Sequence, residues 1–242
     1  ATGKAQIAWG NVISTVDAIH GRPPFKKNVT GLCNIAAFYY QFAQIPVTDF
    51  SIHSISDLRG KALATLPRGN TTEVAARSIL SIFDLNYDDL GKINFASITD
   101  QVNMMKDGQI DAFILTSSVP AAGVLDLSTS RPTRLLPIPD REFRKLKERN
   151  PGWSRAVIPA GTYTGQQEDV PTASFQMHML ASCTDVTDQL SYRIAVALAK
   201  RGSELSAVTA MLQGYDIHVM AKDVGVPFHP GAEQFYIEQG VR

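Results

Sequence analysis

The sequence predicts an α/β fold organised as two lobes, and three observations lead to that prediction. Short β-rich runs alternate with amphipathic runs of helical length between residues 51 and 150. Strands separated by helices are typical of βαβ units. Strand and helix patterns recur more loosely on both sides of this block. The chain has 242 residues, 44% of them hydrophobic, so it can form one large domain or two small ones with a sizeable core.

The predicted elements follow from hydrophobic periodicity and from the turn residues between them. In the central block we expect strands at 61–66, 93–97, 110–116 and 134–138, and helices at 71–83, 99–106, 119–127 and 141–149. In the flanks we expect strands at 5–9 and 172–182, and helices at 11–19, 186–200 and 230–239. The last helix has Pro230 in its first turn and Gly240 just beyond its end, the usual placement of these two residues.

The order of these elements predicts how the lobes are divided. We expect residues 1–50 and 172–242 to form one discontinuous lobe, and residues 51–171 to form the other. The chain would then cross between lobes near residues 50 and 170 and leave a cleft. In open α/β sheets ligands bind outside the carboxyl ends of the strands.

Charge and hydropathy exclude two classes of partner. The chain has 23 basic and 23 acidic residues, and no basic run is longer than Lys26 and Lys27. Nucleic acid and anionic membrane surfaces are therefore not expected as partners. The longest apolar stretches fall far short of the roughly 20 residues that cross a bilayer. The first residues lack both an initiator methionine and a signal-peptide pattern, so we expect any signal peptide to have been removed or never to have been present.

Two cysteines, Cys33 and Cys183, leave two interpretations open. They fit a reduced pair of small buried side chains, which we favour, or one disulfide in an oxidising compartment. Neither a metal signature nor a redox C-x-x-C motif is present.

No sequence motif points to catalysis. The chain lacks a G-x-S-x-G elbow, a phosphate-binding P-loop, a G-x-G-x-x-G fingerprint and an H-E-x-x-H motif. None of its five histidines stands three or four residues from another. We therefore expect no metal, no cofactor and no enzymatic activity.

Polar turns at strand ends are the best candidates for a binding site. Three predicted strands are each followed by a polar turn and a helix start, which contain Trp9 and Asn11, then Arg68, Asn70, Thr71 and Thr72, then Thr116, Ser117 and Ser118. The first turn of a helix has N–H groups without intrahelical partners and carries a partial positive charge. Carboxylates and phosphates bind there readily.

The turn from Arg68 to Glu73 carries the sharpest pattern. Asn70 can cap the helix, and Glu73 can reach back as in a capping box. Gly69 permits a backbone conformation that other residues resist, and Arg68 offers a fork for a carboxylate. The alternative is a capped helix start that needs no ligand.

The other strand-end residues carry the same ambiguity. Ser117 and Ser118 can simply cap the helix that Pro120 helps to open. Asn11 alone would be interpreted as a cap, and Trp9 alone as a core residue. The loop at 158–166 contains Gly161 and Tyr163, and a tyrosine there can close over a ligand and offer its hydroxyl. The alternative is a packed hinge loop.

Several segments resemble the TAXI type of solute-binding subunit of TRAP transporters. They run in family order from about Gly3 to Gly240, and those at 158–172 and 229–232 are the most specific. The matching segments are Ile55-Ser56-Asp57-Leu58-Arg59-Gly60-Lys61, Thr72-Glu73-Val74-Ala75-Ala76-Arg77, Lys106-Asp107-Gly108-Gln109-Ile110-Asp111-Ala112-Phe113, Ile158-Pro159-Ala160-Gly161-Thr162-Tyr163 through Glu168-Asp169-Val170-Pro171-Thr172, and His229-Pro230-Gly231-Ala232.

The resemblance implies a two-lobed fold like that of periplasmic binding proteins, each lobe a mixed sheet with flanking helices. It implies a monomeric periplasmic receptor that captures a small organic anion, a carboxylate or amino acid, and delivers it to TRAP membrane subunits driven by an ion gradient. Asn70-Thr71-Thr72-Glu73 and Ser117-Ser118 depart from the usual family residues, so ligand identity is not carried over. The family's N-terminal strand–helix–strand unit has no counterpart before Gly3, and we expect a trimmed first lobe.

Receptor function is thus the leading hypothesis. A carboxylate would dock at Asn70 to Thr72 and at Ser117 and Ser118, with Arg68 adding a charge-assisted bond and Tyr163 and Asn11 closing over it. The alternative is an enzyme on a similar fold that acts on a small anionic substrate. It would need a positioned acid, base or nucleophile, and the predicted cleft offers only hydroxyls, amides and Tyr163.

Overall fold

A computed structural model describes residues 5–242, except for the side chains of 203, 206, 208 and 210. Residues 1–4, which belong to the first predicted lobe, lie outside the described part. The first half of the chain forms β1 (Ile7–Asn11), α1 (Val12–Ile19), β2 (Leu32–Gln44), β3 (Pro46–Val47), β4 (Ala62–Thr65), α2 (Thr71–Ile82), β5 (Lys92–Phe95), α3 (Ile98–Lys106), β6 (Ala112–Phe113) and β7 (Leu115–Ser117).

The second half continues with α4 (Ala122–Ser130), β8 (Arg134–Leu135), α5 (Asp140–Arg149), β9 (Ser154–Ile158), β10 (Val170–Ser182), α6 (Asp188–Lys200), α7 (Gly202–Val208), α8 (Ile217–Met220) and α9 (Pro230–Glu238). Single-turn 3-10 helices occur at Ile55–Leu58, Tyr87–Asp89 and Ala210–Leu212. The predicted α/β class is confirmed.

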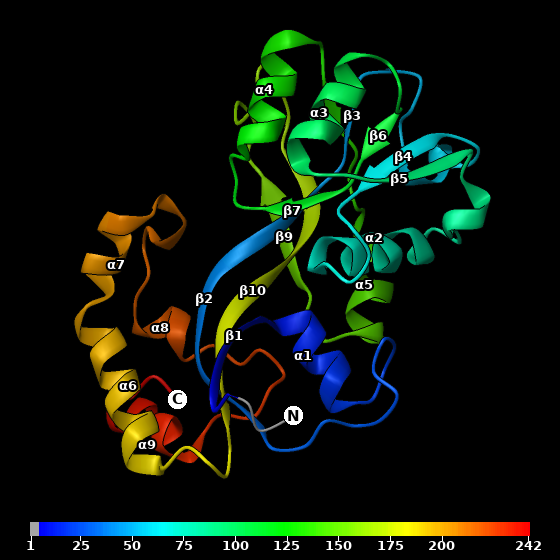
Figure 1. Cartoon of the computed structure of the whole chain (residues 1–242). Coiled ribbons are helices and arrows are strands. Elements are labelled where there is room, and N and C mark those ends of the chain that lie inside the picture. The colour runs from blue at the N-terminus through cyan, green and yellow to red at the C-terminus, as the bar shows by residue number, and fades with distance from the viewer. Residues whose placement is uncertain (1–4) are drawn as a thin grey trace. The chain divides into compact units, whose positions relative to one another are not determined.

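The strands form two sheets. One has the order β1-β10-β2-β7, with β9 also paired to β10. Its two long strands, β2 and β10, run side by side in Figure 1. The other sheet has the order β5-β4-β6-β3-β8. In it β4 is parallel to β5 and β6, whereas β3 is antiparallel to its neighbours β6 and β8.

The chain divides into two compact units. Unit 1 comprises residues 1–40, 150–152 and 175–242, and unit 2 comprises residues 41–149 and 153–174. We predicted that the chain crosses between lobes near residues 50 and 170. The corresponding borders between the two units lie at residues 40–41 and 174–175. These two borders lie within long strands, β2 and β10, whereas the borders at 149–150 and 152–153 lie between α5 and β9.

Each unit has its own apolar core. In unit 1 the side chains of Ile35, Phe38, Ala195 and Tyr236 are buried where α6 and α9 pack together. Figure 1 shows these two helices side by side. A Cβ atom on Gly231 would lie 1.9 Å from the carbonyl oxygen of Asp188, so the close approach of α9 to the start of α6 requires glycine there.

In unit 2 the core gathers around Phe113, Leu115, Val124, Leu127 and Met105, which come from β6, β7, α4 and α3. These residues occupy the apolar faces predicted for the central block. Burial of such faces is the main favourable term in folding.

Three sequence expectations need correction. The predicted strand at 110–116 is two short strands, β6 and β7, which belong to different sheets. The helix expected at 119–127 begins only at Ala122, because a proline at 120 disfavours helical backbone in the residue before it. Strands β2 and β9 were not predicted, since their mixed polar and apolar residues lack a clear period of two.

The cysteines provide a further correction. Cys33 and Cys183 form a disulfide that joins residues 150 apart, with a Cα–Cα distance of 5.3 Å. The favoured interpretation of a reduced pair is therefore wrong. Sequence spacing could not decide this point, because the pairing depends on the start of β2 lying beside the residue that follows β10.

Candidate functional site

The carboxyl ends of three parallel strands bring polar residues together in unit 2. Strands β5, β4 and β6 run in the same direction, so the turns after Thr65, Phe95 and Phe113 lie at one edge of the sheet. Helix α2 begins directly after the turn that follows β4. This edge is where ligands bind in α/β sheets of this kind.

The hydroxyl groups of Thr72 and Thr116 meet at this edge. Their Oγ1 atoms are 2.6 Å apart, and both side chains are buried. Thr72 lies in the first turn of α2, and Thr116 lies in β7. Two of the openings singled out in the sequence are therefore adjacent, and one hydroxyl of the pair donates to the other.

Arg68 is held at the same edge by aromatic rings. Its guanidinium lies 4.8 Å from the centre of the Phe95 ring and 5.9 Å from that of Tyr87. The side chain is exposed, and no described carboxylate lies within ion-pair distance of it. A stacked guanidinium keeps its in-plane N–H groups available for a carboxylate.

The turn before α2 confirms part of the predicted capping pattern. The Asn70 side-chain oxygen accepts a hydrogen bond from the Thr72 backbone N–H at 2.9 Å, and Gly69 has a φ of 86°. Glu73 does not reach back as predicted. Its buried carboxylate pairs with Arg77 at 3.0 Å and accepts a hydrogen bond from the Tyr87 hydroxyl at 3.1 Å.

Tyr87 is fixed beneath Arg68 by this carboxylate. Burial, followed by the charge of Glu73, raises the pKa of the Tyr87 hydroxyl well above its ordinary value. The ring therefore stays neutral and can serve as a platform for Arg68. Thr71, the remaining residue of the predicted turn, is the first residue of α2.

The segment after β7 differs from its predicted role. Ser117 lies opposite Phe42 in the β2–β7 pair, and the Ser118 carbonyl accepts a hydrogen bond from the Gln44 side chain at 3.0 Å. Helix α4 begins after Ala121 without a side-chain cap. The interpretation of the two serines as caps is therefore wrong.

Tyr163 lies in the core of unit 2. Its hydroxyl accepts a hydrogen bond from the Ala121 N–H at 2.8 Å and donates one to the Gln44 side chain. Burial raises the pKa of this hydroxyl to about 12. Gly161 has a φ of 75° in the preceding turn. The hydroxyl is thus already engaged within the protein, and its predicted contact with a ligand stays a prediction.

Trp9 and Asn11 belong to unit 1. The Trp9 ring is 47% exposed, and its centre lies 4.3 Å from that of Phe38. The Asn11 side chain accepts a hydrogen bond from the Ser14 N–H at 2.8 Å, so it caps α1. A ligand role for these two residues stays a prediction.

The sequence pattern missed several residues at the same edge of unit 2. The Thr65 hydroxyl and the Gln101 side-chain oxygen are buried without a described partner. The Gln101 amide donates to the Ala96 carbonyl at 2.8 Å. Only the position of Thr65, the last residue of β4, could have drawn attention to it, since neither residue forms part of a motif.

No metal centre is found in the part of the chain that the structure describes, where histidine, cysteine and acidic side chains form no group of three or more. Within the same residues, no helix combines the length and the apolar character that a bilayer crossing requires.

The fold resembles that of several solved proteins. A protein whose structure is described as that of a periplasmic transporter matches with a TM-score of 0.52 and 11% identity over 96% of this chain and 72% of its own. A TctC solute binding protein from Polaromonas matches with a TM-score of 0.50 and 16% identity over 86% of this chain and 66% of its own. At these identities the likeness shows the fold alone, a two-lobed binding-protein fold.

The aliphatic sulphonate binding protein SsuA from Escherichia coli matches with a TM-score of 0.49 and 16% identity over 96% of this chain. This chain spans 62% of the length of SsuA. A family model provides the assignment, because it matches residues 1–240, nearly the whole sequence. The chain belongs to the NMT1-like family.

Proposed function

We propose that this protein is an extracytoplasmic receptor for a small organic anion, a carboxylate or amino acid, which it delivers to the membrane subunits of a TRAP transporter. The strand-end site of unit 2, formed by Arg68, Asn70, Thr72 and Thr116, supplies the charge and hydrogen bonds for the anion. The names of the Polaromonas protein, a solute binding protein, and of the periplasmic transporter support this class of function.

The single observation that carries the proposal is the state of Arg68. An exposed guanidinium stacked on Phe95, with no described carboxylate nearby, presents its donors at the edge where parallel strands end. A carboxylate fits this fork in bidentate geometry and forms charge-assisted hydrogen bonds. The Thr72 and Thr116 hydroxyls, 2.6 Å apart, share one hydrogen bond, so the hydroxyl that accepts this bond can donate its own proton to an anionic oxygen.

The disulfide supports the proposed location. Disulfides form and persist in oxidising compartments such as the periplasm and the cell surface, and they are rare in the cytosol. The bond between Cys33 and Cys183 links the beginning of β2 to the residue after β10. A periplasmic, monomeric receptor is consistent with this chemistry.

The TRAP partner rests on the sequence resemblance. The segments that resemble TAXI proteins include Thr72 to Arg77, at the start of α2. A genomic neighbour that encodes a large membrane protein with many spans would support the partner. A neighbouring ATP-binding transporter subunit would contradict the TRAP assignment and leave the receptor function standing.

Calorimetric titration with a panel of carboxylates, amino acids and sulfonates tests the function. Native mass spectrometry of protein purified without refolding first identifies any ligand that is carried along. We expect Arg68→Gln to weaken binding of the best ligand at least tenfold, because a charge-assisted bidentate contact is lost. The matched control is Arg193→Gln, an exposed arginine of unit 1, which should bind as the unaltered protein does.

Two outcomes would contradict the proposal. Equal ligand affinity in Arg68→Gln and Arg193→Gln would show that the ligand does not bind at the strand-end site. Chemical conversion of the bound compound during incubation would favour the enzyme alternative over the receptor. Variants Trp9→Phe and Asn11→Asp test whether the predicted residues of unit 1 also contribute to affinity.

A further inference from the structure

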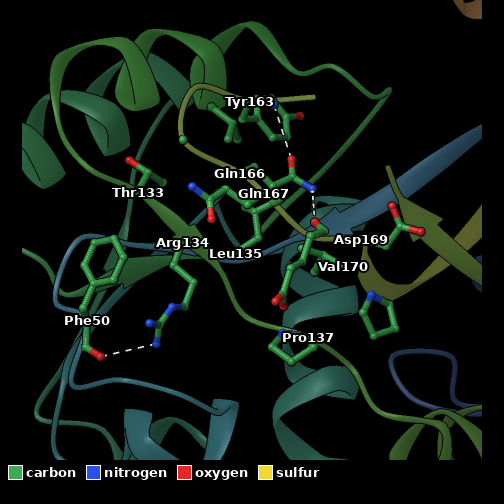
Figure 2. Close-up of a pocket in the computed structure, with 14 residues that line it drawn as sticks. Phe50, Thr133, Arg134, Leu135, Pro137, Tyr163, Gln166, Gln167, Asp169 and Val170 are labelled. Carbon is green, nitrogen blue, oxygen red and sulfur yellow. Dashed lines mark hydrogen bonds between the residues drawn. The ribbon is translucent and has the colours of Figure 1, made fainter. Parts of the chain in front are cut away.

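A cavity lies in unit 2 along the edge strand β8, away from the strand-end site. Its volume is about 510 Å³, within the usual range for pockets that bind small molecules. Figure 2 shows Thr133 and Arg134 on one side of it and residues of the segment from Tyr163 to Val170 on the other. None of Arg68, Thr72 and Thr116 lines it, so it is separate from the strand-end site.

Arg134 supplies a cation with open donors. Its guanidinium lies 4.8 Å from the centre of the Phe50 ring. Its Nη1 atom donates to the carbonyls of Phe50 and Ile52, at 3.3 and 3.4 Å, and to Nδ1 of His53 at 2.8 Å. In Figure 2 the dashed line between Phe50 and Arg134 marks the first of these bonds. Every described hydrogen bond of this guanidinium uses Nη1.

Another arginine of the same unit shows what Arg134 lacks. Arg155 lies over Phe143, and its Nη1 atom also donates to two carbonyls, those of Ile138 and Thr172. Its Nη2 atom then pairs with the Asp140 carboxylate at 2.6 Å. For Nη2 of Arg134, the described residues provide no such carboxylate. An anionic group on a ligand could pair with Nη2 of Arg134 as the Asp140 carboxylate pairs with Nη2 of Arg155.

The rest of the lining determines the other features of the ligand. Apolar side chains line the cavity, which favours an apolar body on the ligand. Glu168 and Asp169 lie at the exposed rim, and the Asp169 carboxylate already accepts a hydrogen bond from the Ala160 N–H at 2.8 Å. Two carboxylates at the rim repel a second negative charge on a ligand. The apolar lining residues are Phe50, Val124, Leu135, Pro137, Val170 and Pro171.

We propose that this cavity binds an amphipathic organic monoanion, such as a short-chain monocarboxylate, whose charged group bonds Arg134 and whose apolar body lies against Leu135 and Val170. This site is independent of the receptor function and would make the chain a protein with two ligand sites.

The test uses hexanoate as the probe and adipate, a dianion of the same chain length, as the comparison. Both are titrated into the Arg68→Gln protein, so that binding at the strand-end site does not obscure the result. Backbone amide shifts in NMR spectra report where each compound binds. We expect hexanoate to shift the amides of Leu135 and of residues 166–170, and adipate to bind at least tenfold more weakly.

Two variants locate the charge and the cavity. Arg134→Met keeps the apolar stem and should weaken hexanoate binding at least tenfold, whereas Arg131→Met, an exposed arginine outside the lining, should leave it within twofold. Arg134 also anchors residues 50–53, so its variant can lose stability. Gln167→Trp, at an exposed lining position, keeps Arg134 and should block the cavity with the same loss of affinity.

The proposal fails if hexanoate shifts only amides outside the lining, if adipate binds as well as hexanoate, or if Gln167→Trp binds hexanoate unchanged. Each of these outcomes leaves the strand-end proposal unaffected, because the hexanoate test is made in protein whose Arg68 is already replaced. Conversely, loss of the receptor function in Arg68→Gln does not alter the hexanoate result.

Discussion

Polar groups near strand ends have different surroundings in the two units. In unit 1, the His178 ring contacts the Thr15 hydroxyl at 2.8 Å and the Asn34 side chain at 3.3 Å, and all three side chains are buried. In unit 2, the Thr72 and Thr116 hydroxyls are buried, but Arg68 beside the same strand ends is exposed. The described contacts of the His178 ring lie within unit 1, where the Asn34 side-chain nitrogen is buried without a described partner. The unit 2 group keeps a cation open to solvent.

This difference shows that one sequence pattern can serve two purposes. Asn11 and Asn70 both follow a strand and both cap a helix. Beside Asn11 the neighbouring polar atoms bond one another, so the pattern there is structural. Beside Asn70 the guanidinium of Arg68 has no described acid partner, and the proposed anion site includes that guanidinium.

Removing the disulfide should change the stability of unit 1 relative to unit 2 more than any other variant considered, because the described cysteines all lie in unit 1. We expect the double variant Cys33→Ser, Cys183→Ser to lose about 2–5 kcal/mol of stability, since the bond closes a long loop in the unfolded chain. Urea unfolding should be followed separately with Trp9 in unit 1 and Trp153 in unit 2, using Trp153→Phe and Trp9→Phe backgrounds.

If the two units behave independently, only the Trp9 transition moves to lower urea. Treatment with a reductant provides the control, because it should destabilise the unaltered protein and leave the double variant unchanged. An unaltered Trp9 transition in the double variant would contradict a stabilising role for the disulfide.

The buried histidine should give unit 1 a distinct pH dependence. Burial lowers the pKa of His178 to about 4, from an ordinary value of 6.5. The unfolded chain therefore binds more protons between these two pH values, and stability falls as the pH falls through this window. The shift corresponds to roughly 3 kcal/mol at most between pH 7 and pH 4.

Thermal unfolding of His178→Gln should isolate this contribution. The unaltered protein should lose stability relative to the variant as the pH drops from 7 to 4. His218→Gln, at an exposed position, is the matched control and should follow the unaltered protein. Parallel curves for His178→Gln and the unaltered protein would show that the histidine does not contribute.

Tyr163 distinguishes a core role from a ligand role in unit 2. Tyr163→Phe leaves the Ala121 N–H and the Gln44 side-chain oxygen without their partner, and we expect a loss of about 2 kcal/mol. Ligand affinity should change less than threefold, because the hydroxyl is already occupied. Tyr192→Phe, which loses a hydrogen bond to Glu238 near the surface, should have a smaller effect on stability. A large loss of affinity with little loss of stability in Tyr163→Phe would restore the ligand role.

The helix caps should give the smallest effect and should not differ between the units. We expect Asn11→Ala and Asn70→Ala each to cost about 1 kcal/mol, because each removes the acceptor for one N–H of the first turn. Asn70→Asp keeps the acceptor and serves as the control. The midpoint of urea unfolding measures the loss of stability in Asn11→Ala and in Asn70→Ala. A much larger cost at Asn70 would mean that its side chain also holds the adjoining Arg68 turn in place.

Local patterns predicted much of the fold. The alternation of strands and helices predicted β4, α2, β5 and α3 within a few residues, and the helix with Pro230 at its start is α9. The caps at Asn11 and Asn70 could also be predicted from the sequence, because a cap is a contact between residues two or three apart. The burial of Tyr163 could not be predicted from the sequence, since its hydrogen-bond partners Ala121 and Gln44 are distant along the chain.

By itself the sequence determined the α/β class, the capped starts of α1 and α2, and the balance of acidic and basic residues, because these depend on composition and on neighbours along the chain. Only the tertiary structure decided that Cys33 bonds Cys183, that Thr72 meets Thr116, and that Arg134 lacks the carboxylate that Arg155 has. Those outcomes depend on which strands become neighbours, and long-range strand pairing is set by the burial of the whole core rather than by any local pattern.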